Sequence, residues 1–108
     1  MTQASLLRYV VLHHTGLEQP HFDVMMETAP GSPLASWRCA HWPPRPADAF
    51  MPLGDHRRDY LDYEGPVSGS RGHVRRVAAG RVQSIAASTD QWTAVLDDGT
   101  RLVLPRSG

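Results

Sequence analysis

The amino-acid sequence predicts an all-β fold, a small antiparallel β-barrel with long connecting loops. Short runs of apolar and β-branched residues recur between turn signals. No segment keeps a helical repeat of apolar residues over several turns. An Asp-Gly pair at 98–99 separates two runs of strand-forming residues, which indicates a hairpin. Because many short strands with regular turns are typical of small barrels and sandwiches, we expect one such domain over residues 1–108.

The first half of the chain contains three expected strands, at residues 6–14, 21–27 and 34–40. A Gly and a Pro lie in the first connection, and a Pro-Gly-Ser-Pro turn lies in the second. Residues 42–52 are rich in proline and are expected to form a surface loop.

The second half begins with a short expected strand at residues 58–64. Two more strands, at 73–79 and 81–87, are expected on either side of Gly80. The last two expected strands lie on either side of the Asp-Gly pair at 98–99 and form a hairpin. A two-residue turn is expected there, because both positions tolerate positive φ.

Composition excludes several classes of protein. The net charge is zero, which argues against a simple electrostatic coat on nucleic acid. One cysteine, Cys39, excludes an intramolecular disulfide and a cysteine-rich zinc module. No apolar run reaches membrane-spanning length and none resembles a signal peptide, so we expect a cytoplasmic protein.

The basic charge is unevenly distributed. All 11 basic residues are arginine, a usage typical of a GC-rich genome. The stretch from Gly65 to Thr89 has no acidic residue, yet it contains Arg71, Arg75, Arg76 and Arg81. Arginine binds phosphate through a planar, two-pronged group, so this clustering is compatible with a phosphate-containing partner.

A candidate metal site begins with the pair His21 and Asp23. Alternate residues of a strand share a face, so these two side chains project together. A hairpin would bring either His13 or His14 beside them, and spacing does not choose between the two. Two imidazoles and a carboxylate suit a hydrolytic divalent metal such as manganese or zinc. The alternative interpretation is that the histidines are incidental strand residues.

Four motifs, in order, resemble the 3′-phosphoesterase domain of bacterial DNA ligase D. Residues 8–14 are similar to the family's Arg-Phe-Val-Val-x-x-His, and residues 21–27 to His-Tyr-Asp-Phe-Arg-Leu-Glu. Residues 34–37 resemble Leu-x-Ser-Trp. Residues 55–65 resemble Asp-His-Pro-Leu-Asp-Tyr-Leu-Asp-Phe-Glu-Gly most closely. The resemblance covers residues 8 to 65.

The resemblance implies a β-barrel that uses a divalent ion, Mn²⁺ first, with Zn²⁺ or Co²⁺ as alternatives. It implies removal of a terminal ribonucleoside and then of a 3′-phosphate from DNA ends. It assigns the metal ligands to His14, His21 and Asp23, and the phosphate-contacting residues to His56 and Tyr60. Imidazole and phenol suit that role, because both can donate a hydrogen bond to an oxyanion.

Departures from the family pattern reduce the phosphate-binding charge. Met25 replaces an arginine, and His41 replaces a lysine. We expect His41, Arg57 or Arg71 to substitute for these cations. We also expect Glu27 to orient a ligand histidine from outside the metal's coordination shell.

The expected function is therefore a divalent-metal-dependent 3′-phosphoesterase that acts on nucleic-acid 3′ ends in DNA repair. It would work at the nucleoid beside a separate ligase or end-joining factor. The leading alternative is a catalytically weakened metal-binding barrel that binds nucleic-acid ends or joins a repair complex.

Overall fold

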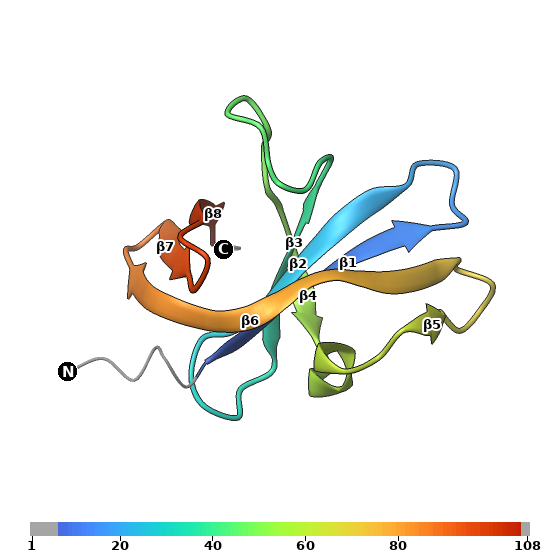
Figure 1. Ribbon diagram of the computed structural model, residues 1–108, viewed down its shortest axis with the longest axis horizontal. Helices are drawn as coiled ribbons and strands as arrows, with labels where there is room; N and C mark the ends of the chain where they lie inside the picture. Colours follow the sequence, from blue (N-terminus) through green and yellow to red (C-terminus); the bar gives the residue numbers. More distant parts are fainter. Residues whose placement is uncertain (1–6, 107–108) are drawn as a thin grey trace.

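The computed structural model describes residues 7–106, which form one curled antiparallel sheet (Figure 1). The terminal residues of the expected domain, 1–6 and 107–108, lie outside the described residues. The elements are β1 (Arg8–Thr15), β2 (His21–Glu27), β3 (Leu34–Cys39), β4 (Met51–His56), the 3₁₀ turn η2 (Arg58–Leu61), β5 (Gly65–Pro66), β6 (His73–Ala87), β7 (Gln91–Leu96) and β8 (Arg101–Pro105). No α-helix occurs between residues 7 and 106.

The strand order is β4-β3-β2-β1-β6-β7-β8, with β5 paired to the beginning of β6. Every pairing is antiparallel. The sheet curls until its edge strands β4 and β8 contact each other. Trp37 Nε1 on β3 donates a hydrogen bond of 2.6 Å to the Pro105 carbonyl on β8, which links the two ends. The all-β prediction is confirmed, and the architecture is a half-open barrel.

The longest strand corrects one prediction. Two strands were expected on either side of Gly80, but β6 runs unbroken from His73 to Ala87 and crosses the whole molecule (Figure 1). Its first part pairs with β1 and its second part with β7. Gly80 leaves room for a neighbour: a Cβ there would lie 2.6 Å from Asp97 Oδ2. The glycine therefore marks a close approach within a strand, not a turn.

Three further local predictions need correction. The expected strand at 58–64 is instead the 3₁₀ turn η2, which turns only Leu61 into the interior. The expected loop at 42–52 ends early, because β4 begins at Met51. The last hairpin does not have a two-residue turn: the Gly99 N–H donates to the Leu96 carbonyl, and Gly99 alone among 97–100 has a positive φ, of 91°.

Both faces of the central strands are buried. One face of β1 and β2 joins the barrel interior through Tyr9, Val11, Val24 and Met26. The other face forms a second, smaller core of Val10, Leu12, Met25, Leu34, Leu61 and Val74. This second core forms the floor beneath the candidate site.

Candidate metal centre

The pairing of β1 with β2 determines which histidine of β1 lies beside His21 and Asp23. His14 lies opposite His21, and Leu12 lies opposite Asp23. Directly paired residues of neighbouring strands share a face, so His14, His21 and Asp23 lie together. His13 lies on the other face, stacked on Phe22 with ring centroids 4.4 Å apart. The choice that spacing alone left open falls on His14.

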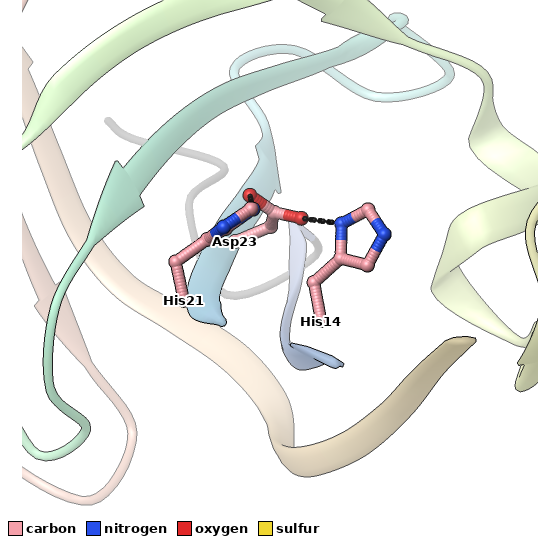
Figure 2. Close-up of side chains that lie close together, drawn as sticks. All are labelled: His14, His21 and Asp23. Carbon is pink, nitrogen blue, oxygen red and sulfur yellow. Dashed lines mark ion pairs between the residues drawn. The ribbon is translucent and has the colours of Figure 1, made fainter. Parts of the chain in front are cut away.

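Asp23 lies between the two imidazoles (Figure 2). His14 Nδ1 is 3.4 Å from Asp23 Oδ2, and His21 Nε2 is 3.3 Å from Asp23 Oδ1. One ligand atom from each residue lies within 4.8 Å of the other two. His21 and Asp23 are buried, and His14 is partly buried at the mouth of the site. A candidate two-histidine, one-carboxylate ligand set is therefore present.

Backbone carbonyls fix the orientation of both rings. His21 Nδ1 donates to the Gln19 carbonyl at 3.0 Å, and His14 Nε2 donates to the Arg71 carbonyl at 2.6 Å. A carbonyl oxygen only accepts, so each of these nitrogens carries hydrogen. In the neutral rings the lone pairs of His21 Nε2 and His14 Nδ1 then face Asp23. Metal-binding histidines are typically oriented in this way.

Unpartnered polar atoms provide a test of whether a cation fits. Among the described residues, the buried side-chain nitrogens and oxygens without a hydrogen bond are His21 Nε2, Asp23 Oδ1 and His56 Nδ1. Leaving such an atom unpaired costs about 1–3 kcal/mol. A divalent cation at the triad would satisfy the first two atoms, and its donor chemistry matches them. The residues therefore fit a metal.

The triad opens into a cleft of about 490 Å³. His56, at the end of β4, and Tyr60, in η2, lie on its wall, with ring centroids 5.7 Å apart in an edge-on arrangement. The cleft is lined by His14, Leu17, His21, Asp23, Met25, Arg38, Leu53, Gly54, His56, Tyr60, Val67, Arg71 and Val74. The structure thus brings together all five residues expected to bind metal or contact phosphate directly.

The three expected substitute cations are not all at this cleft. Arg71 is, but its guanidinium donates to the carbonyl and hydroxyl oxygens of Ser68. His41 lies outside the lining, and its Nδ1 faces the Asp48 carboxylate at 3.0 Å. Arg57 lines a neighbouring hollow that shares Tyr60 with the cleft. Only Arg71 therefore lies where the prediction needs it.

The expected role of Glu27 is wrong in this structure. Its carboxylate accepts hydrogen bonds from the backbone N–H groups of Arg8 and Gly31, and from Arg58 Nη1 at 2.5 Å. Burial alone would raise the pKa of Glu27, but these bonds together lower it below the ordinary value. Glu27 holds strand ends together, while backbone carbonyls orient the ligand histidines.

Sequence reasoning missed one residue, Arg38. It lines the cleft and is paired directly with Asp23 across β2 and β3. Alternation along residues 34–39 places Arg38 on the face opposite Trp37. The sequence could not supply the pairing register that sets it beside Asp23.

No protein-family model matches the chain, and no curated protein matches it significantly. The resemblance to the phosphoesterase domain therefore rests on its motifs. Between residues 7 and 106, no helix has the length and apolar character needed to cross a membrane.

Proposed function

We propose that this protein is a divalent-metal-dependent 3′-phosphoesterase that acts on nucleic-acid 3′ ends in DNA repair. Its reaction would be the removal of a 3′-phosphate or of a terminal ribonucleotide. The observation that carries the proposal is a single cleft that holds a candidate ligand triad and, beside it, the buried and unpartnered Nδ1 of His56. The four motifs shared with the ligase D domain support it.

His14, His21 and Asp23 would hold the cation, proposed to be Mn²⁺, although Zn²⁺, Co²⁺ and ferrous iron also suit these donors. When bound, the ion supplies Lewis acidity to a phosphoryl oxygen and lowers the pKa of a water molecule. The hydrogen bonds to the carbonyls of Gln19 and Arg71 hold both imidazoles in place before the ion arrives.

His56 and Tyr60 would stabilise charge on the phosphoryl oxygens. The ring of His56 lines the cleft, and its buried Nδ1 has no hydrogen-bond partner among the described residues, so this ring would be the one that donates to a phosphoryl oxygen. The ring of Tyr60 packs edge-on against both His56 and Tyr63, which restricts its orientation. Donors held in advance of the reaction stabilise a transition state more effectively than mobile ones.

The proposal is tested with purified protein, Mn²⁺ and two primers, one ending in a 3′-phosphate and one in a ribonucleotide. We expect metal-dependent release of phosphate or of the terminal nucleoside, and loss of both activity and bound metal in His21→Ala. His13→Ala is the matched control, because His13 pairs with Phe22 and its ring lies on the opposite face of the sheet from the triad. Folded, metal-loaded wild-type protein that releases neither product would refute the proposal.

A second candidate function is favoured by the reduced cationic charge. Met25 carries none, and His41 is occupied by Asp48. The protein would then be a metal-binding barrel that recognises nucleic-acid ends or joins a repair complex without turnover. Salt-dependent binding to DNA that survives His14→Ala, without product release by the wild type, would establish this function.

A further inference from the structure

We propose that Arg38 is the phosphate-binding cation of the cleft and gives the site its preference for a terminal phosphate. This inference rests on the proposed phosphoesterase and names the residue that would recognise its substrate. Three observations carry it: the position of Arg38 beside Asp23, its unpaired guanidinium, and the charge that the triad leaves unbalanced.

The position follows from the strand register. Arg38 on β3 is the direct partner of Asp23 on β2. Paired residues have Cβ atoms about 5 Å apart, whereas residues two apart along one strand are about 6.7 Å apart. Arg38 therefore begins nearer to the candidate metal ligand than a side chain at Met25 does. Its side chain lines the cleft together with the triad.

The guanidinium of Arg38 is available. It is exposed, and it forms no hydrogen bond or ion pair with any residue in the range 7–106. Asp23 does not bind it, because both carboxylate oxygens face the imidazoles. The other arginine of the lining, Arg71, donates to Ser68. Arg38 is thus the cationic side chain of the described lining that a ligand can use without breaking a protein contact.

Charge balance indicates what the ligand is. A divalent ion with one carboxylate ligand, Asp23, retains a single positive charge. A phosphate monoester carries close to two negative charges at neutral pH. One further cation brings the site to neutrality, and Arg38 supplies it through a group that can bind two phosphate oxygens. An end that carries only a hydroxyl gains nothing from this cation.

The experiment measures binding of short DNA strands in the presence of Mn²⁺ by fluorescence anisotropy. One strand ends in a hydrolysis-resistant 3′-methylenephosphonate, and the matched strand ends in a 3′-hydroxyl. We expect wild-type protein to prefer the phosphonate, and Arg38→Met and Arg38→Gln to reduce that preference about 30-fold. Arg38→Lys should keep part of it. Mn²⁺ affinity should change less than about twofold, since Arg38 is no metal ligand.

Arg75→Met is the matched control. Arg75 is exposed, and its side chain forms no hydrogen bond or ion pair with the described residues. It pairs with His13, so it lies on the opposite face of the sheet. A preference retained in folded Arg38→Met and Arg38→Gln overturns the inference, as does an equal loss in Arg75→Met. A wild-type protein without preference overturns the inference, and its release of phosphate or of the terminal nucleoside in the primer assay shows whether the proposed function stands without Arg38. A preference that depends on Arg38, with no hydrolysis of a 3′-phosphate primer, supports Arg38 and refutes catalysis alone.

Discussion

Asp23 is the residue that both imidazoles face, at 3.3 and 3.4 Å, and it is the only charged group of the candidate ligand set. Its replacement by asparagine keeps the side-chain shape and removes the charge. We expect Asp23→Asn to lower Mn²⁺ affinity by about 100-fold or more, since losing even an outer-shell partner typically costs 10- to 100-fold. Titration of free Mn²⁺ by electron paramagnetic resonance measures this.

We expect Asp23→Asn to have little effect on the free energy of unfolding of the metal-free protein. Asp23 Oδ1 has no hydrogen-bond partner between residues 7 and 106, so asparagine removes no strong protein contact there. Urea unfolding of metal-free wild-type and Asp23→Asn protein should agree within about 1 kcal/mol. A large loss of stability with unchanged metal affinity would show that Asp23 is a structural residue.

Glu27, unlike Asp23, is expected to contribute to the stability of the protein, because its carboxylate accepts three hydrogen bonds. Its folded-state pKa lies below the ordinary value of 4.5, so its contribution to stability is present above that value. The contribution is lost as the pH falls through the folded-state pKa. Because Arg58 is partly exposed, we expect Glu27→Gln to cost about 1–2 kcal/mol at neutral pH. The difference in unfolding free energy between wild type and Glu27→Gln should shrink when the pH falls below the folded-state pKa of Glu27. Urea unfolding at neutral pH and at such an acidic pH measures it. A pH-independent difference would contradict this account.

At the scale of elements, the loop between β5 and β6 orients one histidine of the candidate metal site. The Arg71 carbonyl orients His14, and Gly72 follows it with φ at 79°. A Cβ at Gly72 would lie 2.1 Å from the Thr15 carbonyl oxygen. Gly72→Ala must therefore displace the loop. We expect a loss of at least about 2 kcal/mol in stability and a 10- to 100-fold loss in Mn²⁺ affinity.

Gly99→Ala provides the matched control. Gly99 also has a positive φ, of 91°, but no atom lies within 4 Å of its added Cβ. We expect a cost of about 1 kcal/mol from backbone strain alone and unchanged metal affinity. Calorimetric titration measures the Mn²⁺ affinity of both variants, and thermal unfolding measures their stability. Together they distinguish the effect of backbone strain from that of a displaced loop. Equal effects on metal affinity would show that the Arg71 carbonyl plays no part in the site.

Local patterns allowed part of this arrangement to be predicted. Alternation along β2 predicted that His21 and Asp23 share a face, and the Asp-Gly pair predicted the last hairpin. That β6 is one continuous strand could not be predicted from the sequence, because a glycine such as Gly80 is typical of a turn. Only the structure shows that Asp97 packs against this glycine. Arg38 was missed for a related reason, since its importance depends on a pairing register between two strands.

At the scale of the whole molecule, the candidate site exists only when the strands of the sheet are paired. Its candidate ligands come from β1 and β2, and the histidine that would contact phosphate comes from β4. The Arg71 carbonyl, which orients His14, comes from the loop before β6. The smaller core beneath them packs side chains from β1, β2, β3, η2 and β6. A cation that binds these residues therefore binds the folded chain and not the unfolded one.

This coupling gives a prediction about thermal stability. A ligand at one hundred times its dissociation constant stabilises the folded state by about 2.7 kcal/mol. For a domain of this size, that corresponds to a rise in Tm of roughly 10 °C or more. We expect Mn²⁺ to produce this rise in wild-type protein and in His13→Ala, and a chelator to reverse it. His21→Ala should show no rise, because the triad loses a ligand while the stacked His13 and Phe22 remain intact. If Mn²⁺ does not change the Tm of the wild-type protein, the three side chains lie close together without binding the metal. They would then be incidental residues of the strands.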